Sequence, residues 1–463
     1  MYRSCQLPLL CIAIWLFAGL GSAAQVTSVP VQVEPATQAG DANTPAPQLS
    51  GAQAANTNVN LTLADAITRA KANSPAFQAA LVQLGIARED RVQARAALLP
   101  NVDYNNGFIY TQGNGTASGR FIANNGVHEY ISEGAVTQNF GLAQVAEYRR
   151  SEAAHALARA KSEIGARGLI VAVVQAYYGL QAATSKEAST RAAADEAQRF
   201  LEITTELERG GEVAHSDVIK AQIQADTQHR AVQDMMLLAE QARLNLAVLV
   251  FPNFFEDFTL ADALDQSPAL PPMADIQQMA EKNNPELAAA LASLAVAERE
   301  VQLAQAAHLP TLALNYWYGI DANQFARNSP LGFTNLGYAA AATLNIPVWH
   351  WGAIESKVRQ AELQQKQAKV ELNAAQRTAI ADLKSFYAEA ETARGQLESL
   401  RNSADLAAES LRLTNLRYKA GESTALEVVD AQNTLTSSRI NYSDGLLRYH
   451  VALANLQTLT GTF

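Results

Sequence analysis

One internal repeat constrains this chain more than any other feature of its sequence. The phrase YKAGESTALEVVDAQ at 418–432 has an earlier counterpart, ERGGEVAHSDVIKAQ at 208–222, at a separation of 210 residues. The same shift aligns 73–100 with 283–310 without a gap and gives 12 identities in 28 positions. A chance match would not keep one register over so long a stretch, so the sequence predicts a tandem duplication.

Each half of the duplication is expected to hold the same series of elements: a helix, two strands, a very long helix, a tip turn and a last helix. Proline stops a helix and pushes the residue before it to extended geometry, so Pro100 and Pro310 mark the helix-to-strand junctions. The first repeat is expected at 59–250, with strands 101–111 and 127–140 and tip turn 209–214. A linker follows at 251–272. The second repeat is expected at 273–463, with strands 311–320 and 336–348, long helix 353–419 and tip turn 420–424.

The N-terminus is typical of an exported protein. Arg3 precedes a short apolar run at 7–20, and small residues at 21–25 suit a signal peptidase, so 1–24 is expected to be a signal peptide. The alternative is a retained N-terminal anchor, but the apolar run is short for a membrane-spanning helix. Residues 25–58 are rich in Ala, Gln, Thr, Asn and Pro, which predicts a disordered tail.

Composition excludes several functional classes. The two cysteines, Cys5 and Cys11, both lie in the expected signal peptide, so the mature chain should have no disulfide and no cysteine metal site. The formal net charge is −10, and there is no basic stripe with interleaved aromatic residues, which argues against nucleic acid as a partner. Beyond the signal peptide, no run of 18 apolar residues predicts a membrane-spanning helix.

The longest expected helix has the residue spacing of a coiled coil. Between 390 and 418, apolar or small residues recur every three or four positions, and a similar spacing with one slip extends upstream to 354. A helix over 353–419 contains no proline, and at 1.5 Å per residue it would span roughly 100 Å. An ordinary long helical bundle would also explain this spacing.

The expected strands favour a barrel in an outer membrane. In 102–110 and 311–320, aromatic or aliphatic residues alternate with polar or small ones, as they do in barrel strands that face lipid. A half-buried sheet of a soluble protein is the alternative. Four strands cannot close a barrel wide enough for a channel, and lipid does not tolerate an open sheet edge. Strands in a membrane would therefore require several chains, and three chains would give twelve strands.

These features resemble the TolC-like outer-membrane factor family of bacterial export channels. The resemblance covers about 60–461 and rests on LTLADAITRAKANSPAFQAA at 61–80, the duplicated Leu-Pro, IPVWHWG at 346–352 and YKAGESTALEVVDAQNTL at 418–435. It implies a mainly α fold with β, in which three chains share a twelve-stranded outer-membrane barrel on a long α-helical coiled-coil tunnel in the periplasm. It also implies the partners: a homotrimer, outer-membrane lipid, a periplasmic adaptor protein and an inner-membrane pump, with no cofactor.

The resemblance makes the two repeated phrases helix–turn–helix tips that dock the adaptor. Glycine suits such turns because it accepts positive φ without cost. In the first tip Asp217 matches Glu427 of the second, but Lys220 replaces the second acid, so only the second tip is expected to line the axis. The adaptor-docking residues would be Gly211, Glu212, Gly421, Glu422 and Ser423.

The resemblance also implies a pore constriction formed by Glu427, Asp430 and Tyr418. The two acids are three residues apart and share a helix face, so three chains would gather six carboxylates around one axis. Such rings select for cations, and mutual repulsion should raise some of the pKa values. Tyr418 stands where the family has a tyrosine that hydrogen-bonds between helices in the closed state. Ser423 stands where some members have an arginine, whose fork of donors a serine cannot supply.

Two other classes of function explain less of the sequence. An enzyme would need a site, and there is no glycine-rich phosphate loop, no Gly-x-Ser-x-Gly and no His-Glu-x-x-His motif. No two of the seven histidines have metal-ligand spacing on one helix face. A periplasmic coiled-coil spacer would explain the long helices but not the duplicated strand pairs with one aromatic face. We therefore expect a passive outer-membrane exit duct of a tripartite efflux or type I secretion system.

Overall fold

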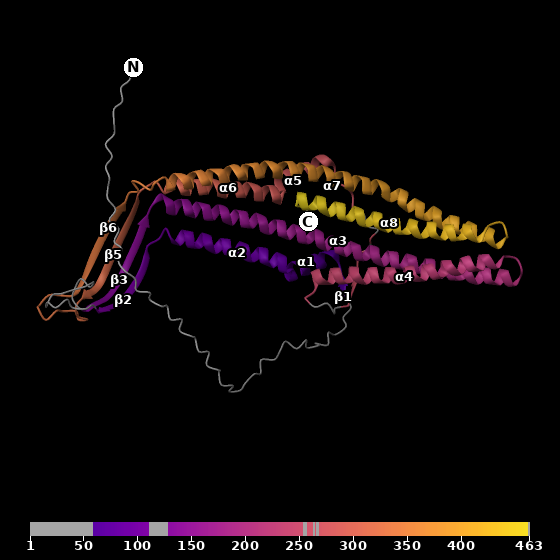
Figure 1. Cartoon of the computed structure of the whole chain (residues 1–463), viewed down its shortest axis with the longest axis horizontal. Helices are drawn as coiled ribbons and strands as arrows, with labels where there is room; N and C mark the ends of the chain where they lie inside the picture. Colours follow the sequence, from indigo (N-terminus) through magenta and orange to yellow (C-terminus); the bar gives the residue numbers. More distant parts are fainter. Residues whose placement is uncertain (1–58, 111–127, 253–256, 263, 265–267, 462–463) are drawn as a thin grey trace, which may run out of the picture. The chain divides into compact units, whose positions relative to one another are not determined.

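The structure, a computed structural model, describes residues 59–110, 128–252, 257–262, 264 and 268–461. The expected signal peptide and tail lie outside these residues, as do positions 111 and 127 at the ends of two expected strands, parts of the expected linker, and 462–463. Two similar series of elements follow one another along the described chain (Figure 1).

The first series consists of α1 (Leu63–Asn73), α2 (Pro75–Ala96), β2 (Asn101–Tyr110), β3 (His128–Phe140), α3 (Leu142–Arg209) and α4 (His215–Val250). The second consists of α5 (Met273–Asn283), α6 (Pro285–Ala306), β5 (Thr311–Ala322), β6 (Leu336–Asn345), α7 (Ala353–Lys419) and α8 (Ala425–Thr460). Two three-residue strands, β1 (Val59–Leu61) and β4 (Phe258–Leu260), pair in parallel outside these series.

A shorter helix precedes the helix expected before each strand pair. α2 begins at Pro75 and α6 at Pro285. Proline has no N–H to donate and its ring collides with the carbonyl one turn earlier, so a continuous helix cannot pass through it. The residue before each proline is a helix cap: the Ser74 hydroxyl accepts from the N–H of Phe77, and the Asn284 side chain accepts from two N–H groups of α6.

Four strands form one antiparallel sheet in the order β2-β3-β5-β6. The two series meet at β3 and β5, where Tyr130 pairs with Ala322. Gly319 suits this junction, because a Cβ atom on it would lie 2.3 Å from the carbonyl oxygen of Ser132. β6 ends at Asn345 instead of the expected 348, since Pro347 lacks the N–H that would extend the ladder. β2 and β6 are the two edge strands.

Large apolar side chains on this sheet are exposed in a single chain. In β2 they alternate with polar or small residues, as expected from the sequence. The exposed side chains of the sheet include Val102, Tyr104, Phe108, Tyr110, Tyr316, Tyr318 and Tyr338. An exposed apolar patch of this kind marks a contact with a membrane or with another protein.

The long helices carry the rest of the fold. α3 has 68 residues and α7 has 67, so each is roughly 100 Å long. α3 pairs with α4 and α7 with α8, which gives two helical hairpins that lie side by side (Figure 1). α3 also packs against α6 and α8 of the second series, whereas in the described chain α7 makes no comparable contact with α2 or α4. No helix among the described residues is both long and apolar enough to cross a membrane.

A compact core joins the linker to α3, and the sequence did not predict it. The Tyr177 hydroxyl lies 3.0 Å from the carbonyl oxygen of Leu61 and 2.9 Å from the Asp262 carboxylate. The same carboxylate accepts from the N–H of Leu63 at 2.8 Å, so Asp262 also caps α1. Burial raises the pKa of Tyr177, which therefore keeps its proton and its hydrogen bonds.

Candidate functional site

The two tip turns share one backbone geometry. Gly211 has φ +78° and Gly421 has φ +74°, both in the left-handed region that favours glycine. In each turn the residue after the glycine donates a backbone hydrogen bond to the last turn of the preceding helix. Glu212 N–H donates to the Leu207 carbonyl, and Glu422 N–H donates to the Arg417 carbonyl, both at 2.9 Å. These are helix C-terminal motifs that end α3 and α7 and reverse the chain.

At the second tip, short hydrogen bonds hold the carboxylate of Glu427. Its backbone N–H donates to the Thr424 hydroxyl at 3.3 Å, and the hydroxyls of Ser423 and Thr424 lie 2.9 and 3.2 Å from its side-chain oxygens. The carboxylate also accepts from the backbone N–H of Thr424, which completes a capping box at the start of α8. Arg417 lies 3.7 Å from the same carboxylate and donates to the carbonyl of Glu422 at 3.0 Å.

These contacts lower the pKa of Glu427 within one chain. The hydrogen bond from Ser423 is the largest cause, and the backbone N–H of Thr424 adds to it. Repulsion among the acids of three chains was expected to raise some of these pKa values. In a single chain those neighbouring acids are absent, and the pKa of Glu427 is lowered. Ser423 stands where some family members have an arginine. Its hydroxyl stabilises the charged form of Glu427.

Glu427 and Asp430 lie on an exposed face of α8, one turn apart, as the sequence predicted. Tyr418 does not lie with them. Its side chain is only 4% exposed and is packed against the ring of Phe200 at 5.0 Å between centroids. Its hydroxyl donates to the Thr204 hydroxyl at 3.3 Å, so Tyr418 joins the end of α7 to the end of α3. Within one chain it connects the two hairpins and does not line an exposed surface.

The first tip differs in charge from the second. Lys220 pairs with Asp217 at 3.0 Å, and His215 lies 2.7 Å from Glu208. The acid that corresponds to Glu427 is therefore paired with a cation one turn along its own helix. This agrees with the expectation that the two tips are not equivalent.

Sequence reasoning missed Thr204, Phe200 and Arg417. Thr204 and Phe200 belong to a long helical pattern, where nothing local distinguishes them from other buried positions. Arg417 could have been noticed, because it precedes the repeated phrase by one residue and a cation there faces the start of the next helix.

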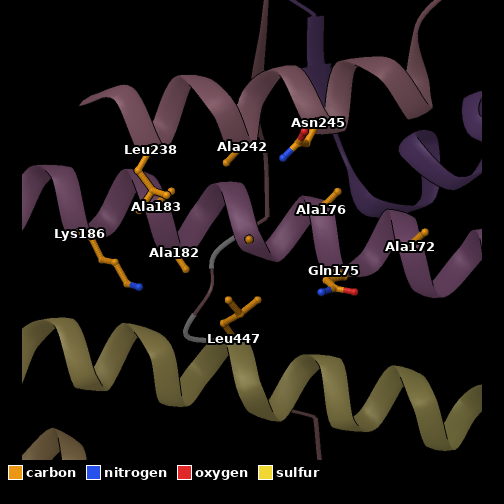
Figure 2. A pocket seen from close by; sticks show the side chains of 11 residues that line it. Ala172, Gln175, Ala176, Ala182, Ala183, Lys186, Leu238, Ala242, Asn245 and Leu447 are labelled. Carbon is orange, nitrogen blue, oxygen red and sulfur yellow. The ribbon is translucent and has the colours of Figure 1, made fainter. Parts of the chain in front are cut away.

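A separate hollow of about 410 Å³ lies between α3, α4 and α8 (Figure 2). Its wall is mostly alanine on α3, with Leu238 and Ala242 of α4 on one side and Leu447 of α8 on the other. Lys186 at its margin forms an ion pair with Asp444. Among the described residues, no group of histidine, cysteine or acidic side chains could hold a metal ion.

Comparison with known proteins identifies the family. The sequence profile of the outer membrane efflux protein family matches residues 66–250 and 276–462, one match in each repeat. These ranges make up most of the chain, so the chain belongs to the outer membrane efflux protein family, whose members reside in the outer membrane. The predicted resemblance is thereby confirmed.

Individual relatives agree with this assignment. The outer membrane protein TolC of Vibrio cholerae is 25% identical over 407 residues, which cover 86% of this chain and 90% of that protein. The alkaline protease secretion protein AprF of Pseudomonas aeruginosa is 24% identical over 413 residues, 87% of this chain and 84% of that protein.

Solved structures show the same fold. The CmeC outer membrane channel of Campylobacter jejuni has a TM-score of 0.76 and 17% identity, with 86% of this chain and 85% of that chain covered. The open state of the MtrE outer membrane channel of Neisseria gonorrhoeae has a TM-score of 0.73 and 21% identity, with 86% and 88% covered. The mainly α fold with a small sheet is therefore that of outer-membrane channels.

Proposed function

We propose that this protein is a passive, trimeric exit duct in the outer membrane, without enzymatic activity of its own. The observation that carries the proposal is the four-stranded sheet with exposed aromatic side chains and two open edges, β2 and β6. Lipid does not tolerate an open edge, so these strands need neighbours of the same kind. Three copies supply twelve strands, in which β6 of each copy pairs with β2 of the next.

The helices below the barrel form the tunnel. α3 and α7 begin close after β3 and β6 and run roughly 100 Å to the tips, which places the tips deep in the periplasm. Exposed tip residues, Glu212 and Glu422 among them, are available to the hairpins of a periplasmic adaptor. The adaptor would couple the duct to an inner-membrane pump, either of an efflux system or of a type I secretion system like the one that the name of AprF describes.

The constriction is formed by Glu427 and Asp430 of the three second tips. Both side chains are exposed in one chain, and α8 presents them on one face. A ring of carboxylates attracts cations and repels anions. Tyr418 contributes indirectly, because it fixes the position of α7 against α3 beside this ring.

A periplasmic coiled-coil spacer is the alternative. It would account for the two long hairpins, but it would leave the aromatic side chains of the sheet in water. Dependence on detergent during purification separates the two, since a spacer needs none.

The test of the duct is single-channel conductance in planar bilayers. The wild-type protein should give a small, cation-selective conductance, and the Glu427→Ala, Asp430→Ala double variant should keep the conductance but lose selectivity. Asp217→Ala, at the matching position of the first tip, is the control and should leave selectivity unchanged. A water-soluble protein without conductance would overturn the duct, and selectivity that ignores the double variant would overturn the acidic ring.

A further inference from the structure

One arginine of the first repeat holds together the ends of two helices of the second. Arg167 of α3 donates to the carbonyl of Asn283, the last residue of α5, at 2.9 Å, and to the carbonyl of Thr458 in the last turn of α8 at 2.8 Å. Both carbonyls lie at helix C-termini, where a guanidinium satisfies free acceptors and opposes the negative end of the helix dipole.

The first repeat has the same pair of helix ends without an arginine. Asn73 at the end of α1 donates its side-chain amide to the carbonyl of Val250 at the end of α4 at 2.7 Å, just as Asn283 donates to Thr460 at 3.0 Å. The shift of 210 residues pairs Arg167 with Arg377. Arg377, however, is exposed and donates only weakly, at 3.3 Å, to a carbonyl of its own helix.

The apolar neighbours of the two arginines show the same difference. Ile170, one turn from Arg167, is 5% exposed and packs with Ala454 of α8, which is 2% exposed. Their counterparts are Ile380 and Leu244, which are 57% and 44% exposed. Ile170 and Ala454 are therefore buried against each other inside the chain, whereas their counterparts Ile380 and Leu244 are both exposed.

Charges at the open counterparts are complementary. Tyr178 packs against the cluster that contains Val174 and stacks on His450 at 3.9 Å between ring centroids. The counterparts of Val174 and His450 are Lys384 on α7 and Glu240 on α4. Two side chains that are buried beside Tyr178 inside the chain are thus replaced by residues of opposite charge, which suits a surface that meets its partner only on assembly.

We propose that Arg377 of one copy binds the carbonyls of Asn73 and Val248 of the next copy, with Ile380 packed against Leu244, so that the contact made by Arg167 inside the chain is made again between chains. The packing of α3 on α6 and α8 has no counterpart for α7 on α2 and α4 in the described chain, and a ring of three copies supplies it. This inference rests on the proposed trimer and assigns the residues that join its copies.

Crosslinking between differently tagged copies tests the contact. One chain carries Ile380→Cys and the other Leu244→Cys, both with Cys5→Ser and Cys11→Ser, and the two are produced together and oxidised in the membrane. We expect a product of two chains that carries both tags. The control is one chain with Ile170→Cys and Ala454→Cys, which should crosslink within itself and stay at the mass of one chain, because these side chains share a cluster in the chain.

The mass of the uncrosslinked protein in detergent, measured by light scattering, separates the two possible failures. A trimer that gives no crosslink between Ile380→Cys and Leu244→Cys would overturn the assigned contact and leave the duct in place. A monomer would overturn the trimeric duct, and the contact with it.

Removal of the arginine provides a second test that does not depend on cysteine geometry. Arg377→Gln should shift the equilibrium between trimer and monomer towards monomer by about tenfold or more, since hydrogen bonds to a charged donor are lost at each junction. Arg359→Gln is the matched control, because Arg359 lies on the same helix and its counterpart Arg149 is itself exposed. Equal effects of the two variants, or none, would overturn the role of Arg377.

Discussion

Glu427 shows how the sequence of one turn sets the charge of a single side chain. The carboxylate accepts hydrogen bonds from the hydroxyls of Ser423 and Thr424 and from the backbone N–H of Thr424, and Arg417 lies 3.7 Å away. All of these favour the ionised form, so the pKa lies below its usual range. Repulsion between three copies would act in the opposite direction. The local hydrogen bonds would then keep Glu427 ionised despite the nearby carboxylates of the other two copies.

The pH dependence of selectivity tests this balance. Carboxylates are charged above their pKa, so cation selectivity of the duct should fall as the pH falls through the pKa of Glu427. Ser423→Ala removes the largest cause of the low pKa, so selectivity should be lost at a higher pH than in the wild type. The measurement is reversal potential against pH in planar bilayers. Ser437→Ala, further along α8, is the control, and identical profiles for the wild type and Ser423→Ala would contradict the role of Ser423.

Tyr418 connects elements that are far apart in the sequence. It ends α7, yet its ring and hydroxyl contact Phe200 and Thr204 near the end of α3. The surrounding cluster also includes Val428 and Ala425 of α8, so both hairpins meet at this side chain. Burial raises the pKa of Tyr418, and the hydroxyl therefore remains a donor at ordinary pH.

A double-mutant cycle tests the link between the hairpins. Tyr418→Phe keeps the ring and removes the hydroxyl, so it should lower the free energy of unfolding by about 1 kcal/mol. Tyr418→Ala also leaves a cavity and should cost about 3–5 kcal/mol. Combined with Thr204→Val, Tyr418→Phe should cost less than it does alone, because its hydrogen-bond partner is already absent. Denaturant unfolding followed by circular dichroism measures these values, and strict additivity would show that the two side chains are not coupled.

Elements of this fold could be predicted where local pattern determines them. The spacing of small residues predicted a helix over 353–419, where the structure has α7, and alternation predicted a strand from 101, where the structure has β2. The short helix α1 before Pro75 was not predicted. The cap that Asp262 provides for Leu63 was missed because it joins residues 199 apart, and no local pattern carries such a contact. By resemblance Tyr418 was expected to hydrogen-bond between helices, but its partner Thr204 lies on α3, 214 residues away, where no local pattern identifies it.

At the scale of the whole molecule, the duplication relates the junctions inside one chain to faces that the chain leaves open. Two similar halves meet through β3 and β5 in the sheet and through α3 against α6 and α8 in the helices. Each of these junctions has a counterpart that the single chain leaves open: β2 and β6 at the sheet edges, and α7 beside α2 and α4. In the proposed trimer, repetition of the same junctions between copies would close both the sheet and the helices into rings.

The two faces of the sheet should respond differently to a buried charge. Phe108 lies on the aromatic face of β2, which would meet lipid in the closed ring, and Phe108→Lys should destabilise the assembled protein by about 2–4 kcal/mol if it lies near the middle of the membrane. Asn105 lies on the opposite face, paired with Glu133 of β3, so Asn105→Lys should be tolerated. Unfolding in lipid vesicles gives both values. A spacer in water would tolerate both variants, because replacement of an exposed phenylalanine by lysine removes apolar surface at no cost. A neutral Phe108→Lys would therefore count against a membrane-facing barrel.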